Sequence, residues 1–184
     1  MYICAFCSSG DKLDDIYYEK AAVFGDYLGK NKINLVFGAG GAGLMGALSE
    51  AMKKYGVEII GIIPEKLNKE HIVSKNLTDL FVTSTMSERK NLMVEKSDGF
   101  VALPGGFGTL EEILEVITLK QLGYFDKPIA FWNFNNFFDP LFAMFDKLYA
   151  ENFAKIENRS LYFISDNVED IMNYILNYQN GSKS

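Results

Sequence analysis

Short apolar runs alternate along the chain with longer segments in which apolar residues recur every three or four positions. The short runs are almost continuously apolar, which is typical of strands covered on both faces. They predict strands at Tyr2–Cys7, Ile33–Phe37, Val57–Ile63, Leu80–Thr83, Phe100–Leu103, Ile129–Trp132 and Leu161–Ile164. The longer segments predict helices at Asp15–Leu28, Leu44–Tyr55, Thr85–Lys96, Leu110–Leu122, Phe137–Ala150 and Val168–Tyr178.

The alternation of strand and helix from end to end favours an α/β fold. It predicts a Rossmann-like, doubly wound, mostly parallel sheet of about seven strands flanked by helices. No linker or repeat interrupts the pattern, so we expect one domain over residues 1–179 and a disordered tail at 180–184. Gly56 and Gly123 follow predicted helices, where a glycine often ends the helix. Ligands of such folds bind at the carboxyl ends of the strands.

Composition argues against several classes of partner. The 184 residues include 18 basic and 24 acidic side chains, for a formal net charge of −6, and no lysine run, which argues against nucleic-acid binding. No apolar run approaches the roughly 20 residues of a membrane span. No basic segment leads into a long apolar one, as it would in a signal peptide. We therefore expect a cytoplasmic protein without membrane contact.

The cysteines and the single histidine predict no metal site. Cys4 and Cys7 are three residues apart on a predicted strand, so their side chains point to opposite faces. That geometry favours two separate buried thiols over a redox pair or a shared metal. His71 is expected to be an ordinary loop residue near the surface.

A glycine-rich turn offers the strongest functional signal. Pro104–Thr109 contains three glycines and lies between a predicted strand and a predicted helix. Glycine allows a ligand to approach the backbone N–H groups closely, and the N-terminus of a helix attracts negative charge. The turn therefore predicts a site for an anion such as phosphate, with the carboxylate of Glu112 beside it.

A second glycine-rich loop, Gly38–Gly43, fits G-x-G-x-x-G between a strand and a helix, as in NAD(P)-binding folds. The expected acid, Glu58, begins the next strand rather than ending it, and the loop follows the second strand, not the first. Two glycine loops on one sheet favour a mononucleotide pocket, although tight turns alone remain an alternative. Neither loop contains the lysine of a nucleoside triphosphatase loop, which favours a monophosphate ligand.

Glu112 and Arg89 each allow two interpretations. Thr109 and Glu112 form T-x-x-E, which is typical of a capping box that begins a helix. Arg89 lies about one turn into a helix that starts at the same edge of the sheet, so it can reach the glycine turn and bind phosphate or carboxylate. The alternative for Arg89 is a surface pair with Glu88.

The segment from Tyr124 to Phe153 is dense in aromatic residues. Packing within the core accounts for many aromatic side chains in a fold of this size. A subunit interface is the alternative for the remainder, because aromatic residues are enriched at the centres of interfaces.

Together these motifs resemble those of one family. P-G-G-x-G-T-x-x-E is matched by Pro104–Glu112, and an upstream R-K by Arg89 and Lys90; further similar segments are Gly38–Gly46, Ile62–Leu67 and Glu115–Pro128. The chain resembles the LONELY GUY family of cytokinin riboside 5′-monophosphate phosphoribohydrolases, often labelled lysine decarboxylases. The resemblance extends from about Ile3 to Phe153.

The resemblance implies hydrolysis of the N-glycosidic bond of a nucleoside 5′-monophosphate to free base and ribose 5-phosphate, without a cofactor or a metal. It implies that Arg89 and Glu112 form the catalytic pair. It also implies a substrate and phosphate site made by Ser9, Gly40, Gly41, Glu70, Lys90, Gly105, Gly106, Gly108, Thr109 and Thr118. The partners expected from the family are a small nucleotide and a second copy of the chain, in a homodimer with active sites near its interface.

Three departures from the family pattern concern substrate choice. Ser87 stands where plant members often carry histidine, Ala39 where glycine is frequent, and Cys7–Gly10 is shorter than the usual C-G-S-S-x-G. They leave the base open, with AMP as an alternative to cytokinin nucleotides. The alternative function is a non-catalytic nucleotide-binding or sensor protein of the same fold, which would not need Glu112 beside the ribose. A pyridoxal phosphate decarboxylase is disfavoured, since no motif for the cofactor lysine is present.

Overall fold

The computed structural model describes residues 1–181 of the chain. The strands are β1 (Tyr2–Phe6), β2 (Asn34–Phe37), β3 (Ile59–Pro64), β4 (Asp79–Thr83), β5 (Gly99–Ala102), β6 (Ile129–Trp132) and β7 (Phe163–Ser165). The α-helices are α1 (Asp15–Lys30), α2 (Gly43–Met52), α3 (Met86–Lys96), α4 (Phe107–Gln121), α5 (Asp139–Ala150) and α6 (Val168–Gly181). Short 3-10 helices are η1 (Lys53–Tyr55), η2 (Glu65–Leu67), η3 (Phe134–Asn136) and η4 (Ile156–Leu161).

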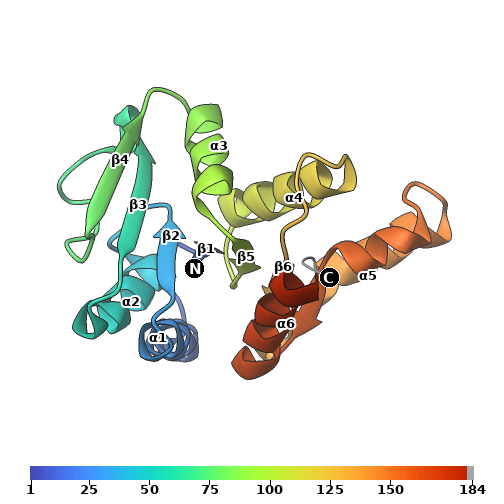
Figure 1. Cartoon of the computed structure of the whole chain (residues 1–184), viewed down its shortest axis with the longest axis horizontal. Helices are drawn as coiled ribbons and strands as arrows, with labels where there is room; N and C mark the ends of the chain where they lie inside the picture. Colours follow the sequence, from blue (N-terminus) through green and yellow to red (C-terminus); the bar gives the residue numbers. More distant parts are fainter. Residues whose placement is uncertain (182–184) are drawn as a thin grey trace.

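The seven strands form one parallel sheet in the order β4-β3-β2-β1-β5-β6-β7, with every neighbouring pair parallel. This confirms the predicted doubly wound α/β fold. The chain winds outward from β1 to β4 and then returns to the other side of β1 with β5 (Figure 1). The order therefore reverses between β1 and β5, and a crevice opens at the carboxyl ends of strands at such a point.

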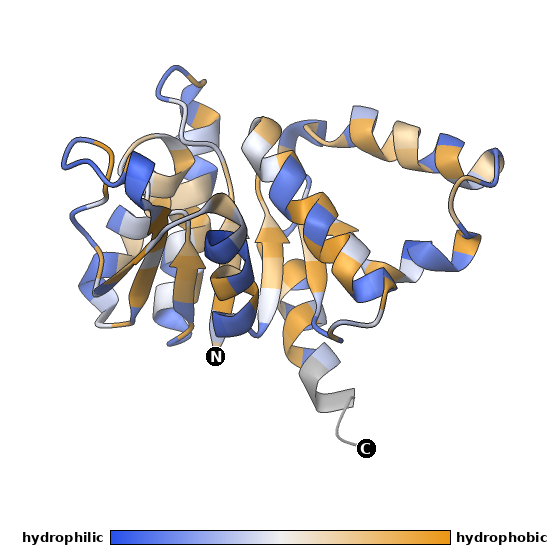
Figure 2. Ribbon diagram, turned by 90° about the horizontal axis from the view of Figure 1, so that it is seen from above, coloured by the Kyte–Doolittle hydropathy of each residue, from blue (hydrophilic) through white to orange (hydrophobic). Residues whose placement is uncertain are grey.

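Helices cover both faces of the sheet. α1, α2 and α6 pack on one face and α3, α4 and α5 on the other, each over its own apolar cluster. The strands are the most continuously hydrophobic elements, while hydrophilic residues gather on loops and outer helix faces (Figure 2). Cys4 belongs to one cluster and Cys7 to the other, so both thiols are buried and free on opposite faces, as predicted.

Several predicted boundaries were wrong in informative ways. α4 begins at Phe107 rather than Leu110. α5 begins at Asp139 because the Asn133 side chain accepts a hydrogen bond from the Phe138 N–H at 2.7 Å and closes the preceding turn. α6 extends to Gly181, so residues 180 and 181 of the expected tail are helical; residues 182–184 lie outside the described part. Gly56 and Gly123 have positive φ, as the predicted helix ends require.

Most of the aromatic segment forms packed core. The Phe131 ring meets those of Phe138, Phe142, Phe145 and Tyr162. Tyr124 and Phe153 are instead 74% and 78% exposed. Among the helices of residues 1–181, none combines the length and apolarity needed to cross a membrane.

Candidate active site

A pocket of about 330 Å³ lies where the strand order reverses. Its walls come from the segment after β1 and from the start of α4, which follows β5. The lining residues are Cys7, Ser8, Ser9, Gly10, Met45, Gly106, Phe107, Gly108, Thr109 and Glu112. Ser9, Gly106, Gly108, Thr109 and Glu112 were predicted from the sequence, and this pocket brings them together. Cys7, Ser8, Gly10, Met45 and Phe107 were missed, although their places directly after β1 or at the starts of α2 and α4 were a usable signal.

The start of α4 presents backbone donors to this pocket. Gly106 is the N-cap residue of α4, and because it has no side chain it cannot accept a hydrogen bond from the first N–H groups of the helix. Within residues 1–181 no acceptor takes the N–H groups of Phe107, Gly108 or Thr109, and the first helical hydrogen bond runs from Leu110 to the Gly106 carbonyl. Three free N–H groups at the positive end of a helix are suited to bind an anion.

The first glycine loop is used differently. At the start of α2, the N–H groups of Leu44 and Met45 donate to the Ser8 carbonyl at 2.9 and 3.2 Å. The Gly41 N–H donates to Ile72, and Gly40 bridges to Val73. The protein's own backbone therefore occupies this helix start. Gly40 and Gly41 were expected to bind substrate, but the neighbouring N–H groups of Leu44 and Met45 are not free to assist them.

The position of Glu58 argues against dinucleotide binding at this loop. It precedes β3, at the edge of the sheet opposite the pocket, where it accepts a hydrogen bond from the Tyr2 hydroxyl at 3.0 Å. The acid of an NAD(P) fingerprint follows the carboxyl end of its strand. The glycine loop thus shapes a turn and packs the fold.

Arg89 and Glu112 form a buried ion pair. The Nη1 atom of Arg89 lies 2.6 Å from Oε1 of Glu112, and each residue is 6% exposed. Arg89 Nε also donates to the Ile62 carbonyl at 2.9 Å. Burial raises the pKa of Glu112, and the nearby guanidinium opposes that rise. The alternative prediction, a surface pair of Arg89 with Glu88, was wrong.

Glu112 is not a helix cap either. α4 begins two residues before Thr109, which is its third residue, so the predicted capping box is absent. The cap occurs on α3 instead: the Thr85 hydroxyl accepts from the Glu88 N–H at 3.1 Å, and the Glu88 carboxylate accepts from the Ser84 N–H at 2.9 Å. Glu112 faces the pocket, one helical turn beyond the free N–H groups.

Comparisons with known proteins identify the family. A family model described as "Possible lysine decarboxylase" matches residues 45–175. A probable cytokinin riboside 5′-monophosphate phosphoribohydrolase of Oryza sativa subsp. japonica is 37% identical over 96% of this chain and 79% of its own length. A cytokinin riboside 5′-monophosphate phosphoribohydrolase of Arabidopsis thaliana is 36% identical, over 96% of this chain and 83% of its own. The chain belongs to the LONELY GUY phosphoribohydrolase family.

Solved structures with the same fold include proteins named for other roles. A molybdenum cofactor binding protein from Rippkaea orientalis has a TM-score of 0.73 and 22% identity, and the alignment covers 96% of this chain and 95% of that one. The Moco Carrier Protein from Chlamydomonas reinhardtii has a TM-score of 0.73 and 18% identity, with 98% of each chain covered. At these identities the likeness concerns the fold alone.

Several residues implied by the LONELY GUY resemblance lie outside the pocket of Glu112. Lys90 is bound by two carboxylates of α4, Glu111 and, at 2.8 Å, Glu115, so it braces α3 against α4. Gly105 borders a separate hollow of about 290 Å³ with Gly106. Thr118 lies on α4 roughly 13 Å beyond Thr109 by helical rise, where its hydroxyl donates to the Leu114 carbonyl.

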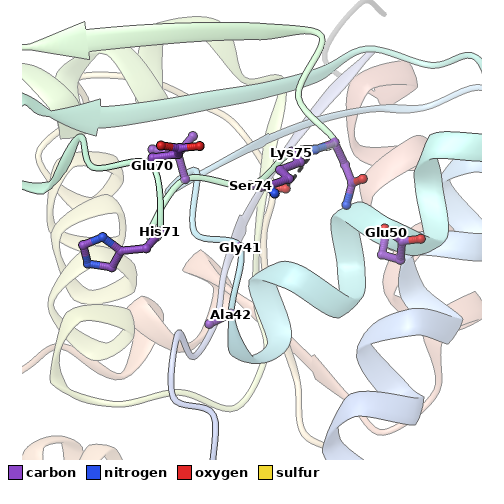
Figure 3. A pocket seen from close by; sticks show the side chains of 9 residues that line it. Gly41, Ala42, Glu50, Glu70, His71, Ser74 and Lys75 are labelled. Carbon is purple, nitrogen blue, oxygen red and sulfur yellow. Dashed lines mark hydrogen bonds between the residues drawn. The ribbon is translucent and has the colours of Figure 1, made fainter.

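Glu70 lines a larger and more open hollow of about 660 Å³ (Figure 3). It lies with His71 on the loop after η2, whereas Gly41 and Ala42 come from the first glycine loop and Glu50 from α2. His71 is exposed, as predicted. Glu70 and Glu112 line separate hollows, so one chain does not bring all the predicted site residues into a single cavity.

Proposed function

We propose that the protein hydrolyses the N-glycosidic bond of nucleoside 5′-monophosphates, releasing free base and ribose 5-phosphate. AMP and cytokinin riboside 5′-monophosphates are the proposed substrates. The observation that carries this proposal is one pocket in which three free N–H groups of α4 stand one turn from the buried carboxylate of Glu112. The family relatives are named for the same reaction on cytokinin nucleotides.

The proposed mechanism follows from that geometry. The N–H groups of Phe107, Gly108 and Thr109 would bind the 5′-phosphate, which leaves the ribose toward Glu112. Cleavage of the bond between C1′ and the base develops positive charge on the sugar, and a carboxylate stabilises that charge or takes a proton from the attacking water. The water oxygen bonds to C1′, and the departing base nitrogen acquires a proton. No lysine lines this pocket among the described residues, which does not favour pyridoxal phosphate chemistry.

We also propose that the protein works as a homodimer. Thr118 borders a groove of about 120 Å³ that α4 shares with α5 and η4, away from the pocket of the same chain. Leu122, Tyr124 and Phe153 are largely exposed. Pairing of these surfaces would cover them and bring Thr118 of one copy toward the site of the other. Sedimentation of the purified chain tests this proposal: a monomer at micromolar concentration would contradict it.

The reaction is tested by incubating the protein with AMP and with isopentenyladenosine monophosphate and measuring the free base. We expect release that Glu112→Gln lowers at least about 1,000-fold, because the charge at C1′ loses its partner. Glu111→Gln is the matched control, since the neighbouring carboxylate contacts Lys90 and does not line the pocket. Tight AMP binding without base release would favour the non-catalytic alternative.

A further inference from the structure

Three contacts hold the guanidinium of Arg89. Nε donates to the Ile62 carbonyl within β3, and Nη1 binds Glu112 on α4. The third nitrogen, Nη2, lies against Gly38, directly after β2: a Cβ atom at this position would overlap Nη2 far inside van der Waals contact. Gly38 has no positive φ, so its backbone does not require glycine. The missing side chain instead makes room for the guanidinium.

Arg89 does not line the pocket of about 330 Å³, whereas Glu112 does. One carboxylate oxygen of Glu112 binds Arg89, and no donor among residues 1–181 binds the other. The guanidinium is thus anchored behind the carboxylate and turned away from the space where substrate would lie. This arrangement differs from that of an arginine poised to protonate or bind the leaving base.

We infer that Arg89 is a positioning residue for Glu112, and that Gly38 and the Ile62 carbonyl form its seat. The first glycine loop thereby serves the reaction through Arg89 rather than by holding phosphate. This inference rests on the proposed function, because only that function gives Glu112 a catalytic role. A misplacement of about 1 Å at a reacting group lowers rates on the order of 100-fold, so filling the seat has a large effect without any contact to substrate.

A double-mutant cycle tests the seat. Gly38→Ala should lower kcat about 100-fold and leave KM within about twofold, because the displaced guanidinium moves away from Glu112 and no longer fixes its carboxylate. Arg89→Lys should have a similar effect, since lysine cannot reach Ile62 and Glu112 together. Lysine also lacks the Nη2 atom, so Gly38→Ala should add little in that background. Independent losses that multiply to about 10,000-fold would overturn the inference.

A readout without substrate separates this inference from the proposed function. Carboxyl NMR titration gives the pKa of Glu112, which Arg89 and Lys90 of α3 lower and Glu111 raises. Cys4 and Cys7, the other titratable neighbours, stay neutral because burial raises the pKa of each thiol. We expect Gly38→Ala to raise the pKa of Glu112 by moving the guanidinium away. An unchanged pKa in a folded Gly38→Ala protein would overturn the seat even if the enzyme is active.

Gly61→Ala is the matched control. Gly61 precedes Ile62, and the atoms nearest to its added Cβ would belong to Ala39 and Leu77, not to Arg89. The substitution should lower stability and leave the pKa of Glu112 unchanged. If Gly38→Ala fails to fold, the Gly38→Ala/Arg89→Lys protein should fold, because the overlap with Nη2 is gone and the remaining close neighbour, Met45 Cε at 3.1 Å, is the end of a flexible side chain. Failure of both would contradict the inference. A wild type that releases no base but shows the expected NMR shifts would sink the proposed function and leave the seat standing.

Discussion

The two glycine loops look alike in sequence and differ in what their glycines face. At the first loop, α2 begins against the chain's own backbone: Ser8 fills the helix start, and a Cβ on Gly43 would overlap the segment Ser8–Gly10. At the second loop, α4 begins against open space: Cβ atoms on Gly106 and Gly108 would meet nothing within 4 Å. A glycine crowded by backbone, such as Gly43, serves the fold, whereas a glycine beside a cavity with free N–H groups, such as Gly108, leaves room for a ligand.

The largest effect should come from Gly43→Ala. Gly43 has φ +60°, and its Cβ would collide with backbone atoms that cannot move independently. We expect a loss of about 3 kcal/mol in the free energy of unfolding, measured by urea denaturation. Gly56→Ala is the matched control, because Gly56 has φ +65° and open space around it. The loss in the free energy of unfolding of Gly56→Ala measures the backbone strain alone, about 1 kcal/mol. Equal losses would mean that crowding at the first loop contributes nothing.

Gly108→Ala should show the opposite pattern. Alanine fits within the first turn of α4 and favours helix, so the protein should unfold at equal or higher urea concentration. The added methyl group would occupy phosphate space and raise KM for AMP about 10-fold, which is about 1.4 kcal/mol of binding. Inorganic phosphate should protect the wild type against unfolding and protect this variant less. A destabilised variant with unchanged KM would break the comparison between the loops.

The pH dependence of stability tests whether Glu112 is a cap or a buried partner of Arg89. A carboxylate capping its own helix would have a lowered pKa, but burial raises the pKa of Glu112. A raised pKa in the folded state gives a stabilising contribution that is complete below the unfolded value and is lost as pH rises through the folded value. The stability of Glu112→Gln relative to the wild type should therefore increase as the pH rises above about 4, the ordinary glutamate value, and passes through the raised folded value. A decrease would mean that the charge of Arg89 outweighs burial.

The fold could be predicted because its evidence is local: apolar runs of strand length, separated by amphipathic helices, admit few arrangements besides a doubly wound sheet. The pocket also followed, since β1 and β5 end at the same edge. The pattern T-x-x-E was misleading because it occurs twice, and only Thr85 with Glu88 forms a cap. What removes Glu112 from that role is a tertiary contact with Arg89, 23 residues earlier. The contact of Arg89 with the Ile62 carbonyl could not be predicted from the sequence either, because every residue has a backbone carbonyl.

The smallest effect should come from the cap on α3. Thr85→Ala removes the hydroxyl that accepts from Glu88, so the free energy of unfolding should fall by about 1 kcal/mol. Thr85→Ser keeps the acceptor and should restore most of that loss. Because Thr85 lies outside the pocket, kcat and KM should stay within about twofold of wild type. Thr109→Ala, at the equivalent position of the second T-x-x-E, should instead raise KM, since Thr109 lines the pocket and forms no cap. If Thr85→Ala raised KM as much as Thr109→Ala, the two segments would not differ in function as the structure indicates.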